Sequence, residues 1–239
     1  PRRTAVLAAM IVPLAATTDA TGARAADCRS YAQQGTDWSG CKKSMLIITG
    51  SQLDNANLAR ADFSFTDFRG SSLKSANIEK AKMIRASFAQ TNLENANLDR
   101  VEAYRVNFSA SIANGATFVN AEVQRADFRD AKLRNTDFTK AELGRADFGG
   151  ADISGSRFTM ANLARARLTG AVWSGPLDFQ NAFLLLTRLD GADLSAATGL
   201  VQDQINLACG DGGTRLPPGL TAPAHWPCGI DPDDSTDPD

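Results

Sequence analysis

The sequence predicts an all-β solenoid in which the chain turns a corner every five residues. Between residues 46 and 175 one position in five is a centre, from Leu53 to Trp173, and no insertion interrupts the spacing. Of the 25 centres nine are leucine and nine are phenylalanine, and the position two residues earlier is always alanine, serine, threonine or valine. A helix would show a period near 3.6 and a strand a period of 2. Self-similarity at a longer fixed period is typical of a solenoid.

A second period, of twenty residues, predicts four sides in each coil. Centres twenty residues apart are alike, and one set is entirely phenylalanine: Phe68, Phe88, Phe108, Phe128 and Phe148. A three-sided coil would instead align Phe68 with Met83, Leu98 and Ala113. Each side sends one large and one small residue inward, so the phenylalanines are expected to stack in one column. At a coil spacing of about 4.8 Å, residues 46–175 would span about 31 Å.

The units at 56–60, 61–65 and 126–130, which read ANLAR, ADFSF and ADFRD, resemble the pentapeptide-repeat family. Its pattern is alanine, then aspartate or asparagine, then leucine or phenylalanine, followed by two variable residues. The resemblance covers more than half of the chain. It implies a right-handed quadrilateral β-helix, with no shared catalytic function and no catalytic residues to carry over.

The segment before the array predicts a leader and a cap. Arg2 and Arg3 precede an apolar run over residues 5–16, so residues 1–25 are typical of a secretory signal peptide cut after Ala25 or Ala26. The run is shorter than the roughly 20 residues that span a bilayer. Residues 26–45 show no repeat and are expected to form an N-terminal cap, in which Trp38 closes the first coil.

After Trp173 the spacing slips by one residue. The stretch 176–179 does not fit the repeat, which resumes at Leu184 and indicates a local bulge, so the array is expected to extend over residues 46–201. A short helix is predicted over 200–208, with Gly210 as its stop signal and Leu200, Ile205 and Leu207 covering the open coil. Residues 202–230 would form a C-terminal cap, which resembles the tail of exported bacterial family members. Residues 231–239 hold five aspartates and two prolines and are predicted to be a disordered acidic tail.

Four cysteines in an exported chain predict two disulfides. Cys28 and Cys41 precede the array, whereas Cys209 and Cys228 follow it. Cysteines whose Cα atoms lie more than about 7 Å apart cannot be bridged. The two ends of the array are much farther apart, so the expected pairs are Cys28–Cys41 and Cys209–Cys228. No metal site is predicted, because neither end offers four ligands.

One column of charge is the most informative surface feature. Two residues after centres spaced by twenty stand five arginines: Arg85, Arg105, Arg125, Arg145 and Arg165. They could form a basic stripe for a polyanion such as an acidic glycan. Alternatively, the glutamates three residues earlier, at 102, 122 and 142, could pair with them in a solvated charged ladder, and this second interpretation is favoured. A neighbouring corner carries Arg60, Lys80, Arg100 and Lys140.

Two further features favour a structural role. His225 is the only histidine, but no serine or aspartate is marked out beside it as a catalytic triad requires. Ala103 and Ala113 lack a large centre and could mark a dent beside Tyr104, although Val101 and Val106 would restore the volume. Neither feature predicts an active site or a cofactor.

The sequence leaves three function hypotheses. The first is a non-catalytic exported solenoid, periplasmic or extracellular, that acts as a structural or protein-interaction scaffold. The second comes from the resemblance, because some family members are cytosolic mimics of duplex DNA that protect a topoisomerase. Those present an acidic rod, whereas residues 46–175 here hold 17 basic and 14 acidic side chains. The third is a periplasmic enzyme that uses His225, which lacks supporting residues. Polyanion binding along the arginine column is a further alternative. The expected partner is a protein or an envelope polyanion, with no small-molecule substrate and nucleic acid disfavoured.

Overall fold

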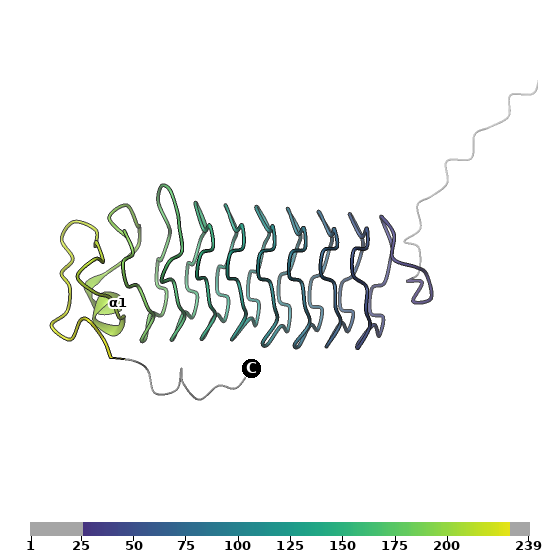
Figure 1. The fold of residues 1–239 in the computed structure, drawn as a ribbon, viewed down its shortest axis with the longest axis horizontal. Helices are drawn as coiled ribbons and strands as arrows, with labels where there is room; N and C mark the ends of the chain where they lie inside the picture. Colours follow the sequence, from purple (N-terminus) through teal and green to yellow (C-terminus); the bar gives the residue numbers. More distant parts are fainter. Residues whose placement is uncertain (1–25, 230–239) are drawn as a thin grey trace, which may run out of the picture.

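The fold is the right-handed, four-sided β-helix that the sequence predicts, so the fold class is confirmed. A computed structural model of the chain describes residues 26–229. Figure 1 shows the coils stacked along the longest axis, from the purple N-terminal end to the yellow C-terminal end. Parallel bridges join residues twenty apart, such as Asp67 with Ser87 and Glu102 with Glu122. Within the described residues each side contributes an isolated bridge rather than a continuous strand.

The residue before each centre forms this bridge, and its side chain also shapes the turn that follows. When it is aspartate or asparagine, its Oδ1 accepts a hydrogen bond from the backbone N–H two residues later. Asp62 accepts from Ser64 at 3.0 Å and Asn107 accepts from Ser109 at 2.8 Å. Short side chains that bond to the nearby backbone favour turns. This local bond explains why aspartate and asparagine recur at one position of the repeat.

The last residue of each side turns the corner with a positive φ angle. The angle is 68° at Gly115, 55° at Asn95 and 57° at Arg125. Glycine and asparagine tolerate this left-handed region, whereas other residues are strained there by about 1–3 kcal/mol. Bonds between coils offset that strain, since the N–H of Arg125 donates to the C=O of Gly144 at 2.8 Å. A corner can therefore carry a long arginine side chain.

The centres fill the interior, and the predicted phenylalanine column is confirmed. Phe128 is fully buried between Phe108 and Phe148, with ring centroids 5.1 and 5.0 Å away and ring planes within about 10°. A second column, which the sequence analysis did not single out, faces the first from the opposite side. Its members are Phe118, Phe138, Phe158 and Phe179, and the first three meet the first column edge to face.

The small position two residues before the centre has a second function where it carries a hydroxyl group. Thr136 is buried, and its Oγ1 donates to the C=O of Ala113 in the preceding coil at 3.0 Å. Thr91 donates in the same way to the C=O of Phe68 at 3.1 Å. Buried polar groups are costly unless they are hydrogen-bonded. Serine and threonine are thus accepted in this narrow interior because they form extra bonds between coils.

The coils begin about ten residues earlier than the sequence indicates. Asp37 bridges to Asn57 and Lys42 bridges to Asp62, so part of the expected N-terminal cap is already a coil. Trp38 occupies a centre and is 2% exposed, whereas the next centre is Lys43, whose Nζ lies 4.0 Å from the centroid of the Trp38 ring. The repeat is hard to see here because a lysine stands where leucine or phenylalanine is expected.

The array also resumes earlier after the break near Trp173. The stretch 176–179 does fit, because Leu177 fills a small position and Phe179 fills a centre, both buried. Phe179 stacks on Phe158 with centroids 5.4 Å apart. Bridges now join residues 21 apart, as in Arg157 with Asp178, so one residue is inserted between 172 and 178. The large Leu177 at a small position hides the register in the sequence.

The C-terminal end is closed by one short helix and the chain that follows it. Helix α1, Gln202–Leu207, lies at the yellow-green end in Figure 1. Ile205 is fully buried, but Leu207 is 41% exposed, so only part of the expected apolar cover points inward. The buried Gln204 anchors the helix, because its Nε2 donates to the C=O groups of Phe179 and Ala182 at 2.9 and 2.8 Å.

Disulfides staple both ends of the array. Cys28 pairs with Cys41, and Cys209 pairs with Cys228, with Cα atoms 5.5 Å apart in each pair. This is the pairing expected from the distance between the two ends. The expected signal peptide at 1–25 and acidic tail at 231–239 lie outside the described residues. No helix within residues 26–229 is long and apolar enough to cross a membrane.

Candidate functional site

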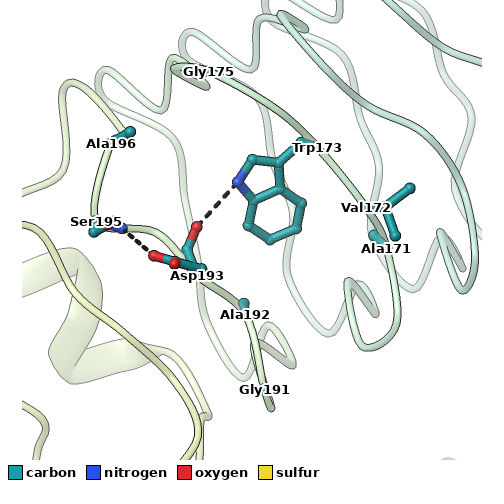
Figure 2. Close-up of a pocket in the computed structure, with 9 residues that line it drawn as sticks. All are labelled: Ala171, Val172, Trp173, Gly175, Gly191, Ala192, Asp193, Ser195 and Ala196. Atoms are coloured by element: carbon teal, nitrogen blue, oxygen red, sulfur yellow. Dashed lines mark hydrogen bonds between the residues drawn. The ribbon is translucent and has the colours of Figure 1, made fainter.

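A cleft of about 370 Å³ opens at the break in the array, on the side of the coil that carries Trp173. Figure 2 shows the indole standing between two coils, with Asp193 and Ser195 on one side and Ala171 and Val172 on the other. Of the 25 predicted centres, Trp173 alone is only partly buried, and the other 24 are buried. Its prediction as a fully inward residue is therefore wrong, and it lies where one residue is inserted into the array.

The indole of Trp173 replaces a backbone bond of the regular coils. Elsewhere on this side the N–H of a centre donates to the bridging residue of the next coil, as Leu133 does to Asp152 at 2.7 Å. At Trp173 it is the side-chain Nε1–H that donates to the C=O of Asp193, at 3.0 Å. Within the described residues no bridge joins Val172 to Asp193. The side chain thus spans a gap that the backbone does not close, and the cleft is that gap.

Asp193 gives the cleft its charge. Its Oδ1 accepts the N–H of Ser195 at 3.1 Å, and its Oδ2 lies 3.5 Å from Nη1 of Arg215. Hydrogen bonding by Ser195, with a smaller effect of Arg215, lowers the pKa of Asp193 below its ordinary value. The carboxylate is therefore ionised at neutral pH. An aromatic face beside an ionised carboxylate can attract a cation, whereas a single carboxylate gives no acid–base pair for catalysis.

The predicted arginine column forms one corner of the coil, away from the cleft. All five arginines have positive φ angles between 53° and 60°. Arg85 is exposed, while the other four are half-buried. Each of those four, Arg105, Arg125, Arg145 and Arg165, has an interaction within the fold. Arg105, for instance, lies with its guanidinium 5.7 Å from the centroid of the Tyr104 ring. The column is thus at least in part a structural feature.

Two residues of the neighbouring basic corner share one acidic partner. Nζ of Lys80 and Nη1 of Arg100 both lie 2.9 Å from Oε1 of Glu79. These are exposed pairs, worth about 1 kcal/mol or less each. Ala103 and Ala113 are buried, as are the two valines at 101 and 106, so no dent forms and Tyr104 remains 40% exposed.

His225 belongs to the C-terminal cap. A ring nitrogen of His225 lies 3.3 Å from the C=O of Ala208, which also accepts a bond from the indole N–H of Trp226 at 2.7 Å. In residues 26–229 no three histidine, cysteine, aspartate or glutamate side chains come together as a metal site would require. His225 thus contacts other residues of the C-terminal cap.

Sequence reasoning located the break but not the cleft. The slip after Trp173 is visible in the sequence, as is the possibility that a bulge shapes a surface there. The pairing of Trp173 with Asp193 is not visible, because it depends on which of two donors, backbone or indole, reaches the next coil. A tryptophan at the last regular centre before a slip is the signal that could have indicated it.

Comparisons with known proteins agree with this architecture. Residues 81–158 match the family described as pentapeptide repeat region, and residues 51–90 match the one described as pentapeptide repeats (8 copies). No curated protein matches the chain.

Two solved structures illustrate the similarity. HetL, a pentapeptide repeat protein involved in heterocyst differentiation regulation from the cyanobacterium Nostoc sp., is 21% identical, with a TM-score of 0.52 over 77% of this chain and 91% of HetL. QnrB1, a plasmid-mediated fluoroquinolone resistance protein, is 17% identical, with a TM-score of 0.41 over 78% of this chain and 90% of QnrB1. HetL shares the fold of this chain, and residues 51–158 of the array carry the repeat of the pentapeptide-repeat family.

Proposed function

We propose that this protein is a non-catalytic scaffold of the cell envelope that binds other proteins on its outer faces. The observation that carries the proposal is the filled interior, in which the phenylalanine and leucine centres of the described coils are buried against one another. Ligand sites of enzymes are usually concave, with several converging polar groups. The Trp173 cleft offers one carboxylate side chain, so rigid outward faces are the main functional surface.

Export is supported by the disulfide at each end of the array. Disulfides persist in oxidising compartments and are rare in the cytosol. The apolar run over 5–16 with Arg2 and Arg3 before it supports the same conclusion. We therefore place the mature protein in the periplasm or outside the cell.

The test is to recover the protein from the cell envelope after mild cross-linking and to identify bound proteins by mass spectrometry. A reduced and alkylated sample of the same chain is the matched control, because it lacks both staples. Intact mass should give an N-terminus at Ala26 or Asp27 and four hydrogens fewer than the fully reduced chain. A retained leader with free thiols would refute export. An activity that is lost in His225→Ala would refute the non-catalytic proposal.

A second candidate function is binding of a polyanion along the arginine column. It is favoured by one observation, the alignment of five arginines at coil spacing on a single corner. Simultaneous replacement of Arg105, Arg125 and Arg145 by glutamine should then reduce retention on an anionic matrix, with at most a small fall in melting temperature from the internal contacts that are lost. Retention that is unaffected while stability falls would show that the column only holds coils together. Binding should also weaken with salt, because exposed charges are screened within about 10 Å at 0.1 M.

The cytosolic DNA-mimic hypothesis receives less support. Such a role needs an acidic rod, whereas the array from 46 to 175 has a small excess of basic residues. The disulfides also favour an oxidising compartment. Addition of the protein to a topoisomerase assay with an inhibitor should therefore leave inhibition unchanged, and protection of the enzyme would restore that hypothesis.

A further inference from the structure

The cleft beside Trp173 combines a fixed aromatic ring with a fixed carboxylate. The Nε1–H bond to the C=O of Asp193 sets the orientation of the indole, so its position does not depend on a ligand. Figure 2 shows the indole between the coil that carries Ala171 and Val172 and the coil that carries Asp193. Preorganised groups bind more tightly because less motion is lost on binding.

The neighbouring residues leave the cleft open. A Cβ atom added at Gly175 or at Gly191 would meet no atom within 4 Å, so no side chain crowds either corner. Three alanines, Ala171, Ala192 and Ala196, are further small residues of the lining. A long side chain from outside could therefore reach the ring without moving the backbone.

Among the described residues, the cation that pairs with the carboxylate of Asp193 is an arginine. The guanidinium of Arg215 lies 3.5 Å from Asp193, although the two side chains are 76% and 53% exposed. Such an exposed and long pair is weak. Arg215 can thus be displaced, and it acts as an internal stand-in for a stronger guanidinium ligand.

We propose that the Trp173 cleft binds an arginine side chain of a partner protein, with the guanidinium stacked on the indole and paired with Asp193. The inference rests on the proposed scaffold function and names the chemistry that one of its contacts recognises. Arginine fits better than lysine because its planar group stacks on an aromatic face and can bond a carboxylate through two N–H groups. Arginine is also enriched among the residues that dominate protein interfaces.

The probe is N-acetyl-arginine N-methylamide, with the citrulline analogue as an uncharged control of nearly the same shape. The readout is the indole N–H signal of Trp173 in a two-dimensional NMR spectrum of the oxidised protein, in which Trp38 and Trp226 supply the other two indole signals. The arginine probe should shift the Trp173 signal at millimolar concentrations and leave the Trp38 signal in place. The citrulline probe should shift neither. Equal shifts with both probes, or none with arginine, would overturn the proposal.

Two variants should change the affinity in opposite directions. Asp193→Asn keeps an acceptor for Ser195 but removes the charge, and should weaken binding about two- to fivefold. Arg215→Gln removes the internal competitor and should strengthen binding by up to about twofold. Unchanged melting temperatures and unshifted Trp38 and Trp226 signals would show that both variants fold. An affinity that neither variant alters would contradict the assignment of Asp193.

A double variant, Asp193→Asn combined with Trp173→Leu, separates this inference from the scaffold proposal. If the wild-type protein and the double variant capture envelope partners equally, and the arginine probe does not bind the wild-type protein, the inference is wrong and the scaffold proposal stands. If the probe binds as expected but no partner is captured from the envelope, the cleft chemistry stands and the scaffold proposal fails.

Discussion

The regular coils and the break at residues 172–178 share one interior but differ in the bonds that join successive coils. In the regular part, backbone N–H groups reach the next coil, as Ile153 does to Val172 at 3.0 Å. At the break, a single indole N–H of Trp173 makes the corresponding bond to Asp193. The regular coils consequently close their sides with backbone bonds, whereas at the break a cleft is spanned by one side chain.

The largest expected difference concerns the interior. Phe128 is fully buried and stacked on both sides in its column, so Phe128→Ala should lower the free energy of unfolding by about 3–5 kcal/mol. Trp173→Ala should cost only about 1–2 kcal/mol, because the side chain is only partly buried and one bond between coils is lost. Urea unfolding of both oxidised variants measures the difference. Equal losses would mean that the break is packed as tightly as the regular coils.

A smaller effect is expected where the irregular C-terminal cap closes on the array. A Cβ atom at Gly210 would lie 2.5 Å from the ring of Trp226, so Gly210→Ala should lower the free energy of unfolding by about 1–3 kcal/mol. Gly212→Ala is the matched control, because its Cβ would meet no atom within 4 Å. Thermal unfolding should separate the two variants. A cap that tolerates both equally would indicate that Trp226 can move away without loss.

In the regular coils, two serines at equivalent small positions test the hydroxyl bonds. Ser156 and Ser111 are both buried, but only Ser156 donates to a backbone C=O, that of Leu133, while Oγ of Ser111 has no hydrogen-bond partner among the described residues. Ser156→Ala should therefore lower the free energy of unfolding by about 1 kcal/mol. Ser111→Ala should be neutral or slightly stabilising, because it removes an unsatisfied hydroxyl. Similar losses in both would show that the small position matters only for volume.

Much of this fold could be predicted from the sequence, because the repeat reports directly on geometry. The spacing of Phe68 and its partners gives twenty residues per coil, and the small residues two positions earlier give the narrow interior. The prediction failed where one residue breaks the pattern while the backbone continues it. Lys43 occupies a centre and Leu177 a small position, so the array was expected to begin too late and the unit at 176–179 was missed. The expected centres from Leu184 onward are buried.

The candidate site was less accessible from sequence. The arginine column was visible because it shares the coil period, but its contacts within the fold were not. The cleft depends on the direction of one side chain, Trp173, and on the residue that it meets in the next coil, Asp193. Neither follows from a periodic pattern, since the pattern ends there.

The smallest expected effect concerns the aspartates that precede the centres, and it tests whether their local bonds stabilise every coil alike. The N–H of Ser64 donates to Asp62, and this bond lowers the pKa of Asp62; the guanidinium and N–H of Arg69 likewise lower the pKa of Asp67. Because these folded-state values lie below the unfolded value of about 3.9, the stabilisation is fully present above about pH 5. It is lost as the pH falls through the lowered pKa values.

The melting temperature of the oxidised protein should accordingly stay level from neutral pH to about pH 5 and decline steadily below about pH 4. Asp62→Asn keeps an oxygen that can accept the Ser64 bond but does not titrate, so this variant should lose less stability than the wild-type chain over the same acid range. Asp54, which lies between a centre and a corner rather than before a centre, supplies the control Asp54→Asn. The contrary outcome is that the melting temperatures of Asp62→Asn, of Asp54→Asn and of the wild-type chain all decline equally steeply with acid. In that case the turn bonds of the repeat do not depend on the charge of the aspartate. Asparagine and aspartate would then alternate at this position for their shared acceptor oxygen alone.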